Sequence, residues 1–310
     1  MEHTTNMKEK ISIFWFRRDL RLEDNVGLFY ALSGKYKVYP IFIFDKEILS
    51  KLPKNDARVA FIHEALQKMQ TELNTKFGSN IALFHDSPKN VFQQLIKNHE
   101  IDTVYTNHDY EPYARERDAA IAKILKESNI QFNTYKDQVI FEKNEILKKD
   151  GQPYKVYTPY MRVWKETFRK QEIQVFNSKE LLHNSVKANK YPNVTLASIG
   201  FEKPTQKIQA YSVTASFIKA YEETRNYPAQ DTTSRLGPHL RFGTVSIRKM
   251  IKKAIAHTNE TFWQELIWRE FFMQILWHFP HTHKSAFKEK YDRIEWRNNE
   301  EEFEKWCKGE

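Results

Sequence analysis

Five short apolar runs, separated by longer amphipathic stretches, occupy the first 140 residues of the chain. The runs are Ile11 to Phe16, Val38 to Phe44, Ile81 to His85, Thr103 to Asn107 and Gln131 to Tyr135. Strands that alternate with helices form a parallel sheet, because each crossover helix returns the chain to the end of the sheet at which the previous strand began. We therefore predict a doubly wound α/β domain with a five-stranded parallel sheet over residues 1–140.

The amphipathic stretches support this pattern. Between the second and third runs, apolar residues recur at steps of three and four, namely Val59, Ile62, Leu66, Met69 and Leu73. This spacing places them on one helical face. Gly78 is expected to end that helix in the left-handed conformation, and Pro112 to open the next one.

The pattern changes after the fifth run. Glycines and prolines punctuate residues 141–205, which nevertheless hold Tyr154, Tyr157, Tyr160 and Trp164. We interpret this part as a long, partly ordered connection, of a length that is usually functional. Residues 206–310 are predicted to be all-α, with helices over Ala215 to Glu223, Ser246 to Ala256, Thr261 to His278 and Glu300 to Trp306.

Composition narrows the function. The 310 residues exceed one ordinary core, so two domains are expected. A net charge of +9 favours polyanionic partners such as nucleic acid, and the single cysteine, Cys307, excludes internal disulfides and multi-thiolate metal sites. No run is long enough for a membrane span, and the polar first ten residues lack a secretory signal. We expect a cytoplasmic monomer with no membrane contact.

The turn from Thr232 to Pro238 combines three hydroxyl groups, Arg235 and Gly237. Hydroxyls, a planar guanidinium and an approachable backbone suit the binding of phosphate. Turns rich in serine and threonine also cap helices, so both interpretations stand.

The predicted helix from Thr261 contains a second unusual pattern. Glu265, Trp268, Arg269 and Phe272 occupy positions i, i+3, i+4 and i+7 and therefore share one face. One interpretation is an ion pair between Glu265 and Arg269 flanked by buried rings. The other is a carboxylate and a stacking ring presented to one planar polar ligand.

Two further groups of polar residues could bind a ligand or a metal. Arg17, Arg18, Asp19 and Arg21 end the first strand, where ligands bind in open α/β sheets, although a local ion-pair network is the simpler role. His278, His281 and His283 surround Pro280, but no carboxylate lies in step with them, so we predict no metal site.

Taken together, the two motifs resemble those of the DNA photolyase and cryptochrome family. The resemblance extends to the segments Phe14 to Asn25, Tyr157 to Tyr160 and Tyr221 to Pro228, and so covers essentially the whole chain. It is closest to cyclobutane pyrimidine dimer photolyases, which are carbon–carbon lyases. These enzymes use photoexcited reduced FAD to split dimers in DNA by electron transfer.

The resemblance implies roles for individual residues. The residues expected to hold FAD are Tyr221, Thr233, Ser234, Arg235, Leu236, Gly237, Phe262, Glu265, Arg269 and Phe272. Glu265 and Trp268 would meet the damaged bases, the first by hydrogen bonding and the second by stacking on flipped bases. Arg225 would contact DNA, and Trp296 would be the outermost tryptophan of an electron relay to the flavin.

The chain also departs from the family pattern. Family members continue into a second half of the flavin-binding domain, so this chain is expected to be truncated, with weakened FAD binding, doubtful repair and marginal stability. Phe262 stands where relatives often have tryptophan. The segment Asn107 to Ala114 lacks the Asn-Glu pair of folate-binding relatives, so the antenna chromophore, if one binds, is not assigned to folate. Two alternatives remain: a cryptochrome-type blue-light sensor, and an inactive fragment or nucleic-acid-binding module.

Overall fold

The computed structural model describes residues 9–187 and 191–310. Residues 1–8, on which the expectation about a secretory signal rests, lie outside the described residues. Residues 188–190 of the predicted connection also lie outside them.

Five parallel strands form one sheet in the order β3-β2-β1-β4-β5. They are β1 (Ile11–Phe16), β2 (Val38–Asp45), β3 (Ala82–Asp86), β4 (Ile101–Asn107) and β5 (Gln131–Tyr135). All five predicted strands are confirmed, with small shifts at their ends. The helices between them are α1 (Val26–Leu32), α2 (Lys46–Leu49), α3 (Ala57–Phe77), α4 (Pro88–Asn98) and α5 (Pro112–Glu127).

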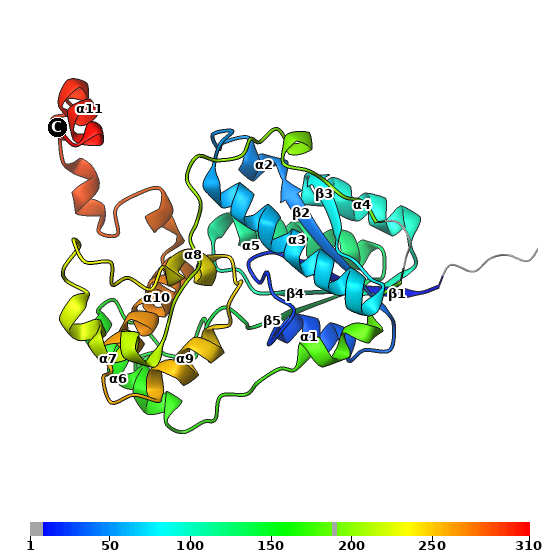
Figure 1. Ribbon diagram of the computed structural model, residues 1–310, viewed down its shortest axis with the longest axis horizontal. Helices are drawn as coiled ribbons and strands as arrows, with labels where there is room; N and C mark the ends of the chain where they lie inside the picture. The colour runs from blue at the N-terminus through cyan, green and yellow to red at the C-terminus, as the bar shows by residue number, and fades with distance from the viewer. Residues whose placement is uncertain (1–8, 188–190) are drawn as a thin grey trace, which may run out of the picture.

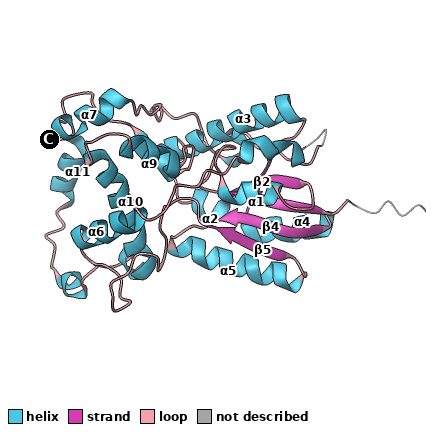
Figure 2. Ribbon diagram, turned by 90° about the horizontal axis from the view of Figure 1, so that it is seen from below, coloured by secondary structure: helices cyan, strands magenta, loops and turns pink. Residues whose placement is uncertain are grey.

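The central strand β1 explains how the two faces are covered. Its Phe14 and Phe16 enter a core shared with α1 and α3, whereas Ile13 and Trp15 enter a second core shared with α4 and α5. Alternate residues of a strand point to opposite faces, so an uninterrupted apolar strand must be covered on both. Figure 2 shows the sheet between α3 and α5. The prediction of a doubly wound α/β unit is confirmed.

The helix boundaries follow local chemistry. Asp56 accepts the backbone N–H of Arg58 at the start of α3, and Gly78 ends that helix at φ +62°, in the left-handed region. Pro112 lies in the first turn of α5, where its missing N–H is not needed. Both predicted boundaries are confirmed.

The second part of the molecule is helical and lies beside the sheet unit (Figure 1). Its helices are α6 (Tyr157–Phe168), α7 (Ala215–Thr224), α8 (Leu236–Arg241), α9 (Ile247–Ile255), α10 (Thr261–His278) and α11 (Glu300–Lys308). Short 3-10 helices cover Ser178–Asn184, Ala197–Ile199, Pro280–His283 and Glu289–Arg293. The predicted helical character after residue 205 is confirmed.

Helix α6 lies within the predicted connection. Its Tyr160, Trp164 and Phe168 are buried in the same core as residues of α9 and α10. Part of the connection therefore packs as an element of the helical core. The domain boundaries at residues 140 and 205 stay predictions.

The segment ending in α11 extends away from the rest of the molecule (Figure 1). Its aromatic residues are exposed, with Trp296 at 70%, Phe303 at 62% and Trp306 at 74% of their full accessibility. Phe303 and Trp306 stack on each other with ring centroids 5.8 Å apart. The expected marginal stability stays a prediction.

Candidate functional site

Helix α10 carries most of the predicted site residues. It packs against α6, α7 and α9. Trp263, Ile267 and Phe271 are buried in the helical core and fix the rotation of the helix. The neighbouring face, with Glu265 and Arg269, is then turned to a cavity.

Two adjacent side chains of α10 also hold the segment that follows β5. The Arg269 Nη1 donates to the carbonyl oxygen of Gln138 at 2.8 Å. The Glu270 carboxylate accepts the backbone N–H groups of Ile140 at 2.7 Å and of Phe141 at 3.1 Å. The wall of the cavity is thus fixed to the end of the sheet unit.

Enclosure by protein changes the acidity of both side chains. It lowers the pKa of Arg269 to about 10, against the effect of the neighbouring Glu270 carboxylate. Burial raises the pKa of Glu270 to about 7, although hydrogen bonds from Trp164, Ile140 and Phe141 oppose the rise. Arg269 therefore remains charged at neutral pH and gives the cavity wall a fixed positive charge.

The cavity, of about 520 Å³, lies between α10, α7 and the loop that leads into α8. Eight of the ten residues predicted to hold FAD line it: Tyr221, Ser234, Leu236, Gly237, Phe262, Glu265, Arg269 and Phe272. Phe262 is buried and contacts the Tyr221 ring edge-to-face at 5.2 Å, so an aromatic wall is present at the position where the resemblance leads us to expect tryptophan.

The loop before α8 is held by its own polar groups. The Ser234 Oγ accepts the backbone N–H of Leu236 at 3.2 Å, and the Ser234 carbonyl oxygen accepts the N–H of Ser212 at 2.9 Å. A Cβ added to Gly237 would meet no heavy atom within 4 Å, so the main chain there faces open space. The loop therefore presents backbone and hydroxyl groups to the cavity.

The remaining predicted residues lie elsewhere in the described structure. Thr233 is exposed and Arg235, at φ +52°, is paired with Asp231 outside the cavity lining. Trp296 lies in the exposed segment before α11. The structure thus brings most, but not all, of the predicted residues together.

Glu265 pairs with Arg225 rather than with its helical neighbour. The Arg225 Nη1 donates to the Glu265 Oε1, and about one third of each side chain is exposed, 33% and 34%. Within residues 9–187 and 191–310, no ion pair joins Glu265 to Arg269. This ion pair joins the end of α7 to α10, and of its two members Glu265 lines the cavity.

Trp268 lies beside the cavity lining and is stacked on an aromatic residue of α6. The rings of Trp268 and Tyr157 are 3.5 Å apart between centroids and 9° from parallel. The Phe272 ring also lies near Trp268, with centroids 5.5 Å apart and planes 23° from parallel. Tyr157 belongs to a resembling segment, but nothing in its spacing indicated this contact.

The α/β unit supplies part of the same cavity, which the sequence did not predict in detail. Arg18, Asp109 and Glu111 line it and also line a second cavity of about 850 Å³. Glu111 accepts Arg18 Nη2 at 2.5 Å and Arg241 Nη1 at 2.6 Å. Although burial opposes the change, these two arginines lower the pKa of Glu111. The position of Arg18 after the first strand was the available signal.

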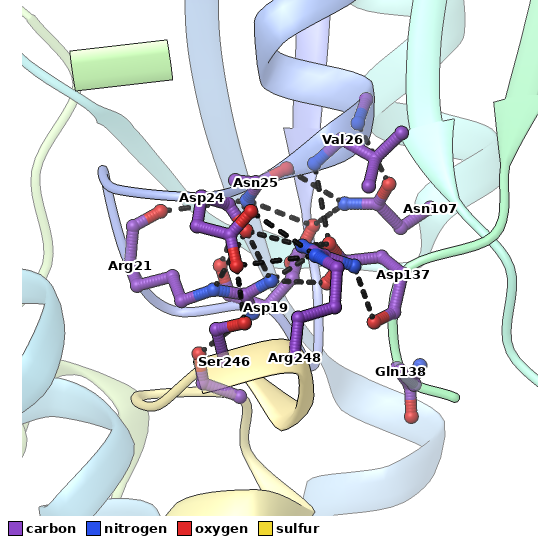
Figure 3. Close-up of polar contacts among 12 residues, drawn as sticks. Asp19, Arg21, Asp24, Asn25, Val26, Asn107, Asp137, Gln138, Ser246 and Arg248 are labelled. Carbon is purple, nitrogen blue, oxygen red and sulfur yellow. Dashed lines mark hydrogen bonds and ion pairs between the residues drawn. The ribbon is translucent and has the colours of Figure 1, made fainter. Parts of the chain in front are cut away.

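A buried charge network joins the two parts of the molecule (Figure 3). Arg248 of α9 bonds to Asp24 at 3.1 Å and to Asp137 at 3.0 Å, and Arg21 bonds to Asp137 at 2.6 Å. No side chain of the four is more than 9% exposed. The ion-pair interpretation of the residues after β1 is confirmed for its three arginines, since Arg17 pairs with Asp118, Arg18 with Glu111 and Arg21 with Asp137.

The loop that follows β1 also makes a close backbone contact with the helical part, at Gly243. Gly243 has φ +66°, and a Cβ added there would overlap the carbonyl oxygen of Arg18. Arg21 Nη1 donates to the Gly243 carbonyl oxygen at 3.1 Å. Only glycine fits both the backbone conformation and the available space.

The histidines at the end of α10 and in the 3-10 helix after it bond to backbone carbonyl groups. His278 Nε2 lies 3.0 Å from the Lys143 carbonyl oxygen, and His283 Nδ1 lies 2.5 Å from that of Pro280. Over the part of the chain that the structure describes, no three potential ligand residues are grouped to hold a metal.

Similarity to known proteins defines the family. Residues 12–179 match the DNA photolyase family, and residues 262–310 match the FAD binding domain of DNA photolyase. The deoxyribodipyrimidine photo-lyase of Synechococcus sp. is 30% identical over 96% of this chain and 67% of its own length. This chain belongs to the DNA photolyase family.

Solved structures agree with this assignment. The class III photolyase from Agrobacterium tumefaciens superposes with a TM-score of 0.81 at 25% identity, over 100% of this chain and 67% of that one. The archaeal photolyase from Sulfolobus tokodaii, crystallised with two FAD molecules, gives 0.71 at 29% identity, over 96% and 67%. The chain spans about two thirds of the length of these relatives.

None of the helices in the described ranges combines the length and apolar character that crossing a membrane requires.

Proposed function

We propose that this chain acts in light-driven repair of cyclobutane pyrimidine dimers in DNA, with FAD as its cofactor. The observation that carries the proposal is the gathering of eight predicted FAD-binding residues around one cavity. These residues come from α7, from α10 and from the loop and first turn of α8. The family match to an FAD binding domain supports the same cofactor.

The residues present fit a flavin nucleotide. Phe262 and Phe272 offer apolar ring surfaces, Ser234 and the open backbone at Gly237 offer hydrogen bonds to phosphate, and Arg269 supplies a fixed positive charge. When bound and reduced, FAD supplies, on absorbing light, the electron that splits the dimer. Thr233 and Arg235 remain proposed phosphate contacts at the edge of this group.

Glu265 and Trp268 would act on the DNA. A carboxylate at the cavity mouth can accept hydrogen bonds from a base edge, and an indole can stack on a base that has left the duplex. Arg225, which is paired with the cavity-lining Glu265, would contact a phosphate of the DNA backbone. Trp296 is retained as the proposed outer member of the electron relay.

The second cavity is the proposed place for an antenna chromophore of unassigned identity. It is larger than the first, with a volume of about 850 Å³, and is lined by apolar residues of β2 and by charged side chains of both signs, among them Arg17, Arg58, Lys284, Asp45 and Glu47. Apolar walls with a small number of polar and charged groups suit a planar polar molecule.

The test is light-dependent restoration of DNA that contains cyclobutane dimers by the purified chain reconstituted with FAD. Repair under blue light, absent in the dark and reduced by Glu265→Ala, is expected. Flavin absorbance without repair would favour a blue-light sensor of the cryptochrome type. A colourless protein that still binds DNA would favour a nucleic-acid-binding module, and a colourless protein without DNA binding would indicate an inactive fragment.

A further inference from the structure

Tyr157, the first residue of α6, covers one face of the Trp268 indole. The two rings are 3.5 Å apart between centroids and 9° from parallel, which is direct face-to-face contact. Tyr157 is itself buried, with 9% of its surface accessible. Tyr157 therefore covers one face of Trp268, and Phe272 also lies near the indole, with its ring 5.5 Å away and 23° from parallel. The indole as a whole remains partly exposed and so accessible to a ligand.

Tyr157 is also bonded to the backbone of the helix that carries Trp268. Its hydroxyl donates to the carbonyl oxygen of Gln264 at 2.8 Å. Gln264 precedes Trp268 by one helical turn on α10, so ring and hydroxyl contact successive turns of the same helix. The Tyr157 ring also packs against Phe271, with the two ring centroids 5.8 Å apart and the rings 71° from parallel.

These contacts persist over the accessible pH range. Burial, reinforced by the nearby Glu265 carboxylate, raises the pKa of the Tyr157 hydroxyl well above its usual range. The hydroxyl thus remains a donor to Gln264. The Tyr157 ring cannot leave Trp268 without breaking both the stack and this hydrogen bond.

We propose that Tyr157 is a positioning residue that acts through Trp268, by holding the indole in one plane for stacking on a base of the dimer. This inference rests on the proposed function and names a residue that the proposed site does not include. A side chain ordered before binding loses less conformational freedom when the ligand arrives, so preorganisation raises affinity. The effect should be selective for DNA in which a base is presented to Trp268.

The experiment compares Tyr157→Met, Tyr157→Phe and the unsubstituted chain for affinity toward matched oligonucleotides with and without one cyclobutane thymine dimer. Methionine fills the space but offers no flat ring. We expect Tyr157→Met to bind the dimer-containing strand about 3- to 10-fold more weakly, as for the loss of one preorganised aromatic contact. Affinity for the undamaged strand should be unchanged, and Tyr157→Phe, which keeps the ring, should retain most of the preference.

Tyr154→Met is the matched control, because Tyr154 is a tyrosine of the same segment that contacts Tyr160 and not Trp268. It should leave the preference intact. If Tyr157→Met does not fold cooperatively, Tyr157→Leu, which also lacks a flat ring, takes its place with the same expected loss.

A double-substitution cycle with Trp268→Leu tests whether Tyr157 acts through the indole. Tyr157→Met should cause no further loss of preference once Trp268 has been replaced. An equal loss in both backgrounds, or full dimer preference in Tyr157→Met, would overturn the inference and leave the proposed function standing. If the unsubstituted chain shows no dimer preference, the proposed function fails first and the inference with it.

Discussion

Two clusters of paired charges lie within the helical part of the molecule and at its border, and they differ in depth. Arg21, Arg248, Asp24 and Asp137 are almost completely buried, and each makes several bonds. Glu265 and Arg225 are about one third exposed and share a single ion pair. A buried charge needs all its partners because water cannot replace them, whereas an exposed pair can open to a ligand at little cost. The extent of burial thus distinguishes the charged residues that hold the two parts of the molecule together from those that can bind a ligand.

The largest effect is expected at the buried cluster. Arg248→Met leaves two buried carboxylates with one fewer cation and should lower the free energy of unfolding by about 3–5 kcal/mol. Urea denaturation would measure it. The neighbouring Lys249→Met is the control, since Lys249 is exposed and lies 3.8 Å from Glu23, and should change stability by less than about 1 kcal/mol. Equal losses in the two variants would remove the distinction drawn from depth.

Glu270 is a buried carboxylic acid that, unlike Asp24 and Asp137, forms no ion pair in the described structure, so it extends the comparison between buried charges. The pKa of Glu270 is raised to about 7 in the folded chain, from about 4.3 in an unfolded one. Because the folded chain holds the proton more tightly, Glu270 contributes its full stabilisation at pH values below its pKa in the unfolded chain. This stabilisation is lost as the pH rises through its pKa in the folded chain, about 7. We expect the free energy of unfolding to fall by roughly 2–4 kcal/mol over this window.

Asp137 should behave in the opposite way. Despite its burial, Arg21 and Arg248 lower its pKa, so its contribution is present above the unfolded value and is lost only as the pH falls through the folded one. Urea midpoints across the pH range would show both slopes. Glu270→Gln should flatten the upper window and leave the acid limb unchanged; a slope that persists in this variant would assign it to another group.

Replacement of the exposed carboxylate should affect binding and not folding. Glu265→Gln is expected to change the free energy of unfolding by less than about 1 kcal/mol. It should weaken the preference for dimer-containing DNA about 10-fold, since a charged hydrogen bond to the base is lost. Glu222→Gln removes the same charge from the exposed side of α7 and should leave the preference unchanged. A large loss of stability at Glu265 would make this pair structural.

The smallest effect is expected at Arg225. Arg225→Gln should lower affinity for damaged and undamaged DNA alike, by about 3-fold, and reduce the salt dependence of binding by about one phosphate contact. Titrations at several salt concentrations would measure this. Lys10→Gln removes a cation paired with Asp102, far from the cavity, and should not alter the slope.

How far the sequence predicts this molecule depends on whether a feature is local. Helix α10 was predicted over its observed bounds, Thr261–His278, because no helix breaker interrupts its run. Helix α6 was placed within a connection because Pro159 and Gly151 suggested irregular structure. Pro159 in fact lies in the first turn of α6, where a missing N–H costs nothing.

The same limit applies to the site. Its eight cavity-lining residues were found by family resemblance, whereas the partners of its charged groups were not. Helical spacing suggested a pair between Glu265 and Arg269, but Arg269 bonds to the carbonyl oxygen of Gln138, 131 residues away in sequence. Glu265 pairs with Arg225, which is 40 residues away in sequence. Such pairings depend on how helices pack, which periodicity within one helix does not encode.

The contact at Gly243 has a consequence for the distance between the two cavities. Arg18 lines both of them, and its carbonyl oxygen rests where a methyl group at position 243 would lie. Adding that methyl group must push the sheet unit and the helical unit apart, and any two molecules held in the cavities would move with them. If both cavities hold chromophores, as proposed above, the hydrogen atom at Gly243 would keep the two chromophores close enough for excitation energy to pass between them, because this transfer weakens steeply with separation.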